Sequence, residues 1–507
     1  MKIKIKLLLV IAFLFPIGET SIISAQTWIQ KGIDLDGVAE NDKFGRSVSL
    51  SADGNTVAIG GSANAGNESF SGHASIFEWN GSEWLQKGSD IEGEADVDLS
   101  GHSVSLSADG NIIAIGAILN DDGGESSGHV RIYEWNDSNW IQKGTDIDGE
   151  DPDDLSGYSV ELSSDGSVVV IGSPRNSDSF FESGQVRIYE WSDSDWTQKG
   201  LDLEGEDGGD NSGWAVGLSS DGNTVAIGAF VNNGNGINSG QVRIYEWIDT
   251  SWIQKGIDID GENMDDQSGW SVSLSSDGNT VAMGAMGADP NGFNSSGHVR
   301  VFSWIGSEWI QKGLNIDGEL AGDFSGHSVS LSSDGNIVAI GAILNSPSLE
   351  VVDAGHVRIY EWIGSAWVQI GMDIDGEAIA DYSGWSVNLS ADGNTVVIGA
   401  LHNDGNGTKS GHARIYLLSP TTGINEVDEL FNSVSIYPNP NAGLINIDMG
   451  NLVDVSVKLY DVSGRLIYHK KNIKTTIHQI ELNEVPGIYF IELRSQGEKR
   501  TYELVRK

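Results

Sequence analysis

Residues 100–117 read Ser-Gly-His-Ser-Val-Ser-Leu-Ser-Ala-Asp-Gly-Asn-Ile-Ile-Ala-Ile-Gly-Ala, and this stretch recurs with few changes along most of the 507-residue chain. Its Asp-Gly turn occurs seven times, at Asp53, Asp109, Asp165, Asp221, Asp277, Asp334 and Asp392. Successive turns are 56, 56, 56, 56, 57 and 58 residues apart. Self-similarity at such a period indicates one supersecondary unit that is stacked repeatedly. The chain therefore contains seven copies of one structural repeat.

Each repeat shows the pattern of four short β-strands. In the second copy we predict them at residues 102–107, 111–117, 129–135 and 140–147. The first alternates apolar residues with serines, as a half-buried strand does, and the second is almost wholly apolar, as a strand covered on both faces is. Asp109-Gly110 forms the turn between them, where glycine accepts a positive φ. Four antiparallel strands in each of seven repeats predict an all-β fold, a seven-bladed β-propeller.

The outer strand of every repeat begins with the motif Trp-Ile-Gln-Lys-Gly or a close variant. The motif starts at Trp28, Trp84, Trp140, Trp196, Trp252, Trp309 and Trp367. The last repeat ends near Pro420 with no such strand after it, whereas Trp28 precedes the first repeat. Pairing of the N-terminal strand with the last repeat would remove two open sheet edges. We therefore predict that the strand beginning at Trp28 closes the ring.

Composition limits the classes of partner. The chain has no Cys and a net charge of −44, and residues 27–432 hold 16 Lys and Arg against 64 Asp and Glu. Such a surface repels nucleic acid and anionic membranes. It favours divalent cations, cationic partners or simple solubility, and we expect a monomer.

The two ends of the chain differ from the repeats. A basic head, an apolar run over residues 7–18 and a small residue before Gln26 predict a signal peptide over 1–25. That run is too short to span a bilayer, and no later one is long enough for a transmembrane segment. We expect the propeller over 26–419, a polar linker over 420–432, and a small immunoglobulin-like β-sandwich over 433–507, where seven short strand patterns follow one another.

The last 75 residues carry several motifs in a fixed order. They are Tyr437-Pro438-Asn439-Pro440 with Gly443, Asp461-Val462-Ser463-Gly464-Arg465, Pro486-Gly487-Ile488-Tyr489-Phe490 and Val505-Arg506-Lys507. With these motifs the segment closely resembles the type A sorting domain of the type IX secretion system of Bacteroidota. The resemblance implies Sec-dependent export and then passage across the outer membrane, with the type IX machinery as partner. It also implies that the sorting domain is removed and that the protein is released or held at the outer cell surface.

The repeats themselves resemble a second family. Phe44-Gly45-Arg46-Ser47-Val48 is similar to the opening of an FG-GAP repeat, and Gly172-Ser173-Pro174 is similar to its close. The resemblance covers about 390 residues and implies the propeller fold that integrin α subunits also contain. Integrin-type repeats carry an Asp-x-Asp-x-Asp-Gly calcium loop between strands one and two. Here that turn is only Ser-Ala-Asp-Gly-Asn, so the resemblance implies no calcium site at this turn.

Acidic residues also cluster between strand four of one repeat and strand one of the next. Two of these loops contain Asp146, Asp148, Glu150 and Asp154, and Asp258, Asp260, Glu262 and Asp266. A hard cation such as Ca²⁺ needs six to eight oxygen ligands, and this spacing could supply several of them. The alternative is that Asp and Gly serve here only as turn formers. Both interpretations stay open, and Ca²⁺ is the one cofactor for which we find candidate ligands.

Aromatic residues supply the candidate ligand-binding positions. Trp214, Trp270 and Trp385 follow the Ser-Gly that opens strand one, where the other repeats place Arg46, His102, Tyr158 and His327. In propellers this position lies near the mouth of the central channel, so these rings could stack on a sugar or a peptide; packing at the rim explains them equally well. The loop between strands two and three, where all length variation lies, adds Arg175, Phe180 and Phe181.

A histidine or a glutamine begins the third strand of every repeat. The residues are His73, His129, Gln185, Gln241, His298, His356 and His412. A catalytic or metal-binding histidine rarely occurs once in every blade, and glutamine would replace it poorly. We therefore predict a structural hydrogen bond at this position within each blade.

The sequence contains no visible catalytic set. A propeller enzyme would show a nucleophile and a base that break the repeat symmetry, and no such pair stands out. We therefore expect a secreted or cell-surface propeller that acts as an adhesion or ligand-binding module for a glycan or an extracellular protein, and not an enzyme. A glycan-active enzyme and a structural surface-layer component are the alternatives, because a fold does not by itself choose between them.

Overall fold

The computed structural model describes residues 26–63, 70–292, 294–348 and 351–419. Nearer the C-terminus it describes residues 434–438, 441, 443–450, 452, 454–461, 465–482, 485, 487–495 and 498–507. The predicted signal peptide (1–25) and linker (420–432) lie outside these residues. One compact unit spans Ala25–Ser419, and a second contains Pro420–Lys507.

The described residues of the first unit form seven antiparallel sheets, the blades, each with four strands and a short fifth strand beside the third. Blade I contains β3 (Phe44–Leu50), β4 (Thr56–Gly61), β5 (His73–Trp79), β6 (Trp84–Gln86) and β7 (Ile91–Glu92). Blade II contains β8 (Ser100–Leu106), β9 (Ile112–Ala117), β10 (His129–Trp135), β11 (Trp140–Gln142) and β12 (Ile147–Asp148). Blade III contains β13 (Ser159–Leu162), β14 (Val168–Ser173), β15 (Gln185–Ser192), β16 (Asp195–Gln198) and β17 (Leu203–Glu204).

Blades IV to VII repeat this arrangement. Blade IV contains β18 (Ala215–Leu218), β19 (Thr224–Ala229), β20 (Gln241–Ile248), β21 (Ser251–Gln254) and β22 (Ile259–Asp260). Blade V contains β23 (Ser268–Leu274), β24 (Thr280–Ala285), the 3₁₀ helix η1 (Pro290–Gly292), β25 (His298–Ile305), β26 (Glu308–Gln311) and β27 (Ile316–Asp317). Blade VI contains β28 (Ser325–Leu331), β29 (Ile337–Ala342), β30 (His356–Trp362), β31 (Trp367–Gln369) and β32 (Ile374–Asp375). Blade VII contains β33 (Ser386–Leu389), β34 (Thr395–Ala400) and β35 (His412–Leu418).

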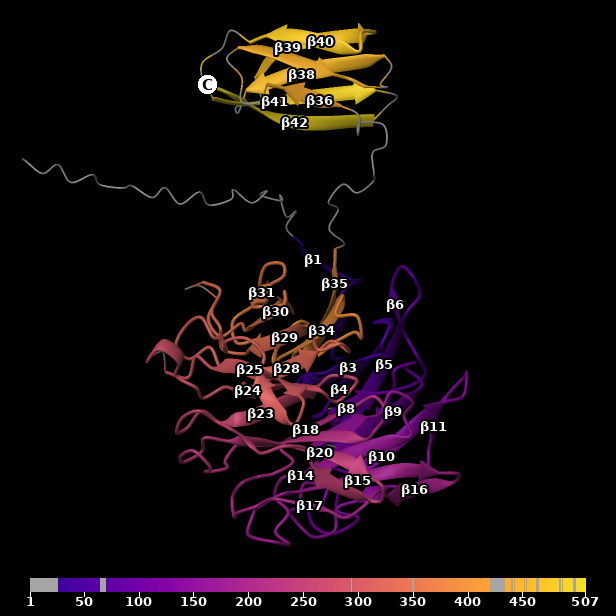
Figure 1. The fold of residues 1–507 in the computed structure, drawn as a ribbon. Coiled ribbons are helices and arrows are strands. Elements are labelled where there is room, and N and C mark those ends of the chain that lie inside the picture. The colour runs from indigo at the N-terminus through magenta and orange to yellow at the C-terminus, as the bar shows by residue number, and fades with distance from the viewer. Residues whose placement is uncertain are drawn as a thin grey trace, which may run out of the picture. The chain divides into compact units, whose positions relative to one another are not determined.

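The N-terminal strand closes the ring, as the sequence predicts. Strands β1 (Trp28–Gln30) and β2 (Leu35–Asp36) both pair antiparallel with β35 of blade VII. Trp28 lies opposite Leu418, and Leu35 lies opposite Ala413. Figure 1 shows the indigo β1 beside the orange β35. Blade VII thereby gains the outer strands that its own repeat lacks.

The first strands of all seven blades surround a central channel. Two cavities lie along it, of about 270 and 260 Å³, and residues from every blade line each of them. Beside the Asp-Gly turns, one backbone N–H of each blade donates to a carbonyl of the next blade, at distances of 2.8 to 3.0 Å. These bonds form a closed backbone circle through Ala52, Ala108, Ser164, Ser220, Ser276, Ser333 and Ala391. A circle that returns to its first residue shows that the seven repeats complete the ring.

Adjacent blades approach so closely that glycine is required at their contact. A Cβ atom on Gly116 of β9 would lie 2.1 Å from the carbonyl oxygen of Gly157 in blade III. The equivalent glycine of blade VII, Gly399, meets the carbonyl oxygen of Gly45 at the same calculated distance. Apolar side chains of neighbouring blades fill the remaining space, as where Ile132 and Val130 of blade II pack with Val169 and Ile171 of blade III.

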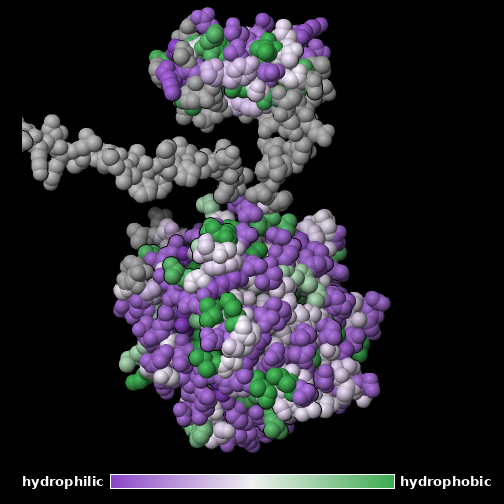
Figure 2. All heavy atoms as spheres, viewed as in Figure 1, coloured by the Kyte–Doolittle hydropathy of each residue, from purple (hydrophilic) through white to green (hydrophobic). Residues whose placement is uncertain are grey.

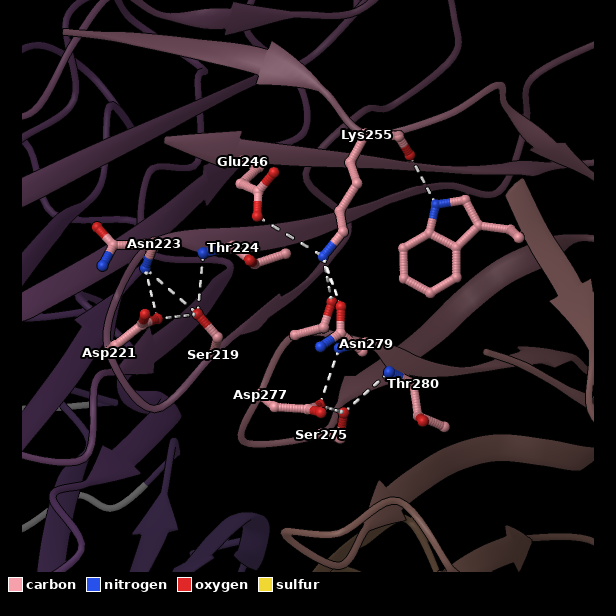
Figure 3. A network of polar contacts seen from close by, with 12 residues as sticks. Ser219, Asp221, Asn223, Thr224, Glu246, Lys255, Ser275, Asp277, Asn279 and Thr280 are labelled. Atoms are coloured by element: carbon pink, nitrogen blue, oxygen red, sulfur yellow. Dashed lines mark hydrogen bonds and ion pairs between the residues drawn. The ribbon is translucent and has the colours of Figure 1, made fainter. Parts of the chain in front are cut away.

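A buried lysine joins most pairs of blades. Lys255, which follows β21, donates to the carbonyl oxygen of Gly278 at 3.0 Å and to Asn279 Oδ1 at 2.9 Å in the Asp-Gly turn of blade V (Figure 3). Within the described residues, the same pair of bonds is made by Lys31, Lys87, Lys199 and Lys312. The turn residue Asp277 accepts bonds from Ser275 Oγ and the Asn279 N–H, and these bonds lower its pKa although its burial alone would raise the pKa.

The fourth strand differs from the prediction. We expected one strand over 140–147, but the structure has two short strands, β11 and β12. Gly144 lies between them with a φ of +83°, which ends the extended conformation. The Lys143 N–H bonds the carbonyl oxygen of Ile132, so the chain still follows the third strand. The Lys-Gly pair, which is Ile370-Gly371 in blade VI, thus marks a break inside each outer strand.

The second unit consists of two antiparallel sheets. One contains β36 (Ser435–Tyr437), β37 (Leu444–Asp448) and β40 (Ile477–Glu481). The other contains β39 (Leu466–Ile473), β38 (Val455–Asp461), β41 (Gly487–Ser495) and β42 (Glu498–Arg506). Side chains from both sheets, among them Ile447, Leu459 and Ile491, share one hydrophobic core. The seven strands match the seven predicted patterns, and the immunoglobulin-like topology stays a prediction.

The propeller surface that faces the viewer in Figure 2 is mainly hydrophilic. Figure 2 shows hydrophilic residues over most of the visible propeller surface, with hydrophobic residues scattered among them. Among the described residues, no helix is long and apolar enough to cross a membrane.

Candidate functional site

Most of the candidate residues lie on one face of the propeller. Strand one begins and strand two ends at the same edge of each blade, as the pairing of Ser100 with Ala117 shows. The loops between strands two and three, and those that lead to the next blade, therefore lie on one face, here called the loop face. The Asp-Gly turns lie on the opposite face.

The structure brings Trp214, Trp270 and Trp385 together in a closed ring around the channel. We call this set the mouth ring; it consists of Arg46, His102, Tyr158, Trp214, Trp270, His327 and Trp385, one residue from each blade. Consecutive aromatic rings have centroids 4.4 to 5.8 Å apart. Arg46 completes the circle, since its guanidinium lies 5.2 Å from the Trp385 ring and its Nη2 donates to His102 Nε2 at 3.0 Å.

The mouth ring surrounds the cavity of about 260 Å³ and leaves its tryptophans half-buried. Phe230, from the loop after β19, packs on Trp214 and Trp270 with centroids at 4.4 and 4.9 Å. Burial, reinforced by the charge of Arg46, holds the pKa of His102 well below its usual range and lowers that of His327 to about 3. Both imidazoles are therefore neutral at physiological pH, and Arg46 is the one cation of the ring.

Deeper in the channel lies Glu161, a residue that sequence reasoning missed. It takes the place in β13 that serine holds in β3, β8, β23 and β28, and it lines the cavity of about 270 Å³. Its Oε2 accepts a bond from the Leu218 N–H at 3.0 Å. Burial raises the pKa of Glu161 to about 8. The break in the serine pattern was the sequence signal that could have identified it.

Arg175, Phe180 and Phe181 belong to the loop between β14 and β15. Arg175 lies near the mouth ring: burial raises the pKa of Tyr158 to about 12, and the charges of Arg46 and Arg175 oppose this shift. Phe180 is 53% exposed and Phe181 is 74% exposed. Both belong to the loop face of blade III, and Arg175 is also exposed.

The acidic candidates of the loop after β11 fall into two groups. Asp154 is buried and accepts bonds from the Asp151 N–H and from Asn176 Nδ2, while Glu150 lies 3.7 Å from Arg187 and accepts a bond from Gln185. Asp146 and Asp148 instead each place a carboxylate oxygen 4.0 Å from Nδ1 of His129. The structure thus separates these four residues rather than gathering them around one point.

The equivalent residues after β21 are largely engaged by protein groups. Gln254 donates to Asp258, Asn315 donates to Glu262, and the Asn263 N–H donates to Asp266. Burial and the neighbouring Asp258 raise the pKa of Asp260. Within the part of the chain that the structure describes, these four carboxylates do not form a cluster of ligand atoms.

The sorting-motif residues that can be placed lie in the second unit. Tyr437 ends β36 and Pro438 follows it, whereas Asn439, Pro440 and Gly464 lie outside the described residues. Gly487 begins β41, and the buried Tyr489 donates its hydroxyl to the carbonyl oxygen of Val485 at 2.5 Å. Tyr489 is therefore a core residue that fixes the loop before its own strand.

Comparison with solved structures gives distant likenesses. The chain is 11% identical to the GH74 enzyme of Niastella koreensis, over 92% of this chain and 73% of that one, with a TM-score of 0.44. It is 12% identical to the β-propeller domain of the Trilobed protease from Pyrococcus furiosus, over 72% of this chain and 91% of that one, with a TM-score of 0.39. No curated protein matches the chain.

Family models match both units. The FG-GAP repeat model matches residues 373–416, and the secretion system C-terminal sorting domain matches residues 435–507. A sorting domain of this type directs export, so the protein is secreted or located at the outer cell surface. The chain is therefore a β-propeller with an FG-GAP repeat over residues 373–416, and residues 435–507 are a type IX secretion C-terminal sorting domain.

Proposed function

We propose that the exported propeller is a binding module and that its mouth ring holds a neutral glycan. The observation that carries this proposal is the closed ring itself. Three tryptophans and Tyr158, all half-buried, surround one cavity on the loop face. Flat aromatic surfaces of this kind bury the apolar faces of a sugar, while polar groups at the edge fix its orientation. In an exported protein such a site would serve adhesion to extracellular glycans.

Charge narrows the class of ligand. Residues 27–432 hold 64 acidic against 16 basic residues, and the acidic loops lie on the same face as the mouth ring. An anionic glycan would be repelled by this field. A neutral glycan is therefore favoured, with a peptide as the competing ligand.

The carboxylates of the channel support binding rather than hydrolysis. Most glycoside hydrolases need two carboxylates on either side of the scissile bond. Among the described residues that line the two cavities, Glu161 is the single carboxylate. It also faces the deeper cavity rather than the mouth ring.

A glycan array with the purified protein tests the proposal, with Trp214→Leu, Trp270→Leu and Phe181→Ala as variants. We expect neutral glycans to bind, each tryptophan variant to lose at least tenfold in affinity, and Phe181→Ala to bind like the wild type. Thermal unfolding of each variant checks that it folds. Binding that is lost in Phe181→Ala but kept in the tryptophan variants would contradict the mouth ring as the site. A complete lack of glycan binding would move the proposal to peptide ligands.

A further inference from the structure

His129, the first residue of β10, is a fully buried histidine with an exposed fraction of 0%. Among the described residues, neither of its ring nitrogens has a hydrogen-bond partner. This differs from the structural hydrogen bond that the sequence predicts at this position. Buried polar side chains in proteins are normally paired, so an imidazole in this state points to a ligand.

The Nδ1 atom of His129 faces a group of carboxylates. Glu94, Asp122 and Asp146 each offer one oxygen, and these three oxygens and a nitrogen of His129 all lie within 4.8 Å of one another. The ligands come from three segments of two blades. Glu94 lies in the loop after β7 of blade I, Asp122 in the loop between β9 and β10, and Asp146 just before β12.

We propose that Glu94, Asp122, His129 and Asp146 bind one divalent transition-metal ion, of which Zn²⁺ is the simplest example. An imidazole nitrogen together with carboxylates is a ligand set that Zn²⁺ accepts, usually in tetrahedral geometry. With bonds of about 2.1 Å, neighbouring ligands of such a site lie about 3.4 Å apart, close to the 4.0 Å between His129 Nδ1 and Asp146 Oδ2. Ca²⁺ takes oxygen ligands only, so the histidine separates this site from a calcium loop.

The surrounding charges also favour a divalent ion. Arg131 is the cation that contacts the cluster, with its Nη1 3.4 Å from Glu94 Oε1. The three carboxylate ligands and the guanidinium leave two negative charges, and Asp148, whose Oδ1 also lies 4.0 Å from His129 Nδ1, adds a third. One divalent cation would neutralise most of this charge. Gln142 Nε2 donates to Asp146 Oδ1, so Oδ2 is the oxygen turned toward His129. Such outer bonds orient metal ligands.

Blades III and IV show how the nitrogen at this position is paired without a metal, although Oε1 of each glutamine has no partner among the described residues. Gln185 Nε2 donates to Glu150 Oε2, and Gln241 Nε2 donates to Glu206 Oε2, each at 3.2 Å. Glu150 and Glu206 occupy the same position of the repeat as Glu94, one and two repeats later. Glutamine therefore pairs with the carboxylate directly, whereas neutral histidine offers a lone pair that a cation can take.

Other blades hold less complete versions of the cluster. Blade VII offers Asp34, Asp36 and His412, and blade VI offers Glu319, His356 and Asp373. In blade V, Asn315 replaces the residue that corresponds to Asp146, and among the described residues no cluster forms around His298. The four ligands of blade II make it the tightest site of the series, and His298 provides a matched control.

Isothermal titration of the purified, EDTA-treated protein with Zn²⁺ tests the proposal. We expect one Zn²⁺ ion to bind with higher affinity than any other. His129→Gln and Asp122→Asn should each lower this affinity at least tenfold. His298→Gln should titrate like the wild type. Since glutamine occupies this position in blades III and IV, His129→Gln is expected to fold, and thermal unfolding in EDTA checks this. Visible absorption of the Co²⁺ form should show nitrogen ligation that His129→Gln removes.

Two results would overturn the proposal. One is a wild-type protein that binds no Zn²⁺, or that binds it as well after His129→Gln as before. The other is a site that takes Ca²⁺ and is indifferent to His129→Gln, because the carboxylates alone would then be the ligands. A midpoint of thermal unfolding that Zn²⁺ raises in the wild type but not in His129→Gln would support the proposal independently of calorimetry.

Discussion

The interface between blades IV and V and the interface between blades VI and VII are built from the same repeat, yet they differ at one central position. At the first, Lys255 donates to Gly278 and Asn279 of the next blade. At the second, the corresponding residue is Ile370, which is 7% exposed and packs in the apolar core that the two blades share. The indole N–H next to this position donates to its backbone carbonyl in both cases, from Trp309 to Lys255 and from Trp28 to Ile370.

This difference indicates that the position of Lys255 and Ile370 must hold a large side chain, but that the side chain need not be charged. A lysine must lose its hydration here, and burial indeed lowers the pKa of Lys255. Its bonds to the turn offset that cost. An isoleucine avoids the cost and gains packing instead, and a hydrophobic replacement of a buried polar group is often neutral for stability. The close backbone contacts, which both interfaces share, should therefore matter most.

The largest effect is expected from adding a methyl group at the shared glycine contact. A Cβ on Gly228 would lie 2.2 Å from the Gly269 oxygen, and one on Gly341 would lie 2.1 Å from the Gly384 oxygen. Gly228→Ala and Gly341→Ala should each lower the free energy of unfolding by about 3 kcal/mol, since the blades must move apart. Urea unfolding measures this. Gly217→Ala, where the nearest atom is 3.4 Å away, is the control and should change little; equal losses in all three variants would contradict the expectation.

Removing Lys255 should lower the free energy of unfolding by less than the two glycine substitutions do. In Lys255→Ala the Gly278 and Asn279 oxygens lose their donor, and leaving buried acceptors unpaired costs about 1–3 kcal/mol. Lys255→Met keeps the apolar part of the side chain and should lose less than Lys255→Ala. The same urea unfolding compares the two. A Lys255→Met protein that is less stable than Lys255→Ala would contradict the expectation that a filled volume stabilises this interface.

Blades IV and V, on the two sides of the first interface, should also respond differently to acid. Blade V has His298 where blade IV has Gln241, and burial, together with Arg300, lowers the pKa of His298 to about 4. Between pH 6.5 and 4 the unfolded imidazole binds a proton that the folded one does not, so this contribution to stability falls as the pH falls. At pH 5.5 the loss is about 1 kcal/mol. Below pH 7, the stability of His298→Gln should therefore fall less steeply with pH than that of the wild type. Above pH 7, the pH dependence of the two proteins should be the same. Urea unfolding midpoints at pH 7.5, 6.5 and 5.5 measure this.

The smallest change in stability is expected when Ile370, at the interface between blades VI and VII, is replaced by lysine. Blade VII already has Gly393 and Asn394 in its Asp-Gly turn. The lysine of Ile370→Lys would therefore meet acceptors equivalent to those that Lys255 uses in blade V. The gain from two hydrogen bonds and the cost of burying the ammonium should nearly cancel, within about 1 kcal/mol. Thermal and urea unfolding of Ile370→Lys measure the balance. A loss of several kcal/mol would mean that blade VII cannot accept the side chain.

The blade number, the closing strand and the mouth ring were predictable because each depends on position within the repeat. Residues that follow the same glycine at the start of strand one in every repeat must meet at the axis, which is why Trp214, Trp270 and Trp385 could be named together. The break at Gly144 was less visible, because the residues on both sides of it keep a strand-like pattern. Only the recurring Lys-Gly pair indicated it.

The cluster around His129 could not be predicted from one loop. Glu94 and Asp122 belong to loops of different blades, and their distance depends on the angle at which two blades pack. The sequence pattern instead favoured carboxylates within one loop, such as Asp146 and Asp154, which the structure separates. The raised pKa of Glu161 likewise depends on enclosure by all seven blades and not on its neighbours in the chain.

The backbone circle beside the Asp-Gly turns has no first or last member. Each N–H donates in the same rotational direction, and the last, from Ala391, returns to the carbonyl oxygen of Ala52. A chain that ended one repeat early would therefore leave an unpaired backbone N–H at one open edge and an unpaired carbonyl oxygen at the other. Those two edges are complementary, so incomplete products would tend to join edge to edge with another copy. In this protein the completed circle leaves none of these seven N–H and carbonyl groups unpaired.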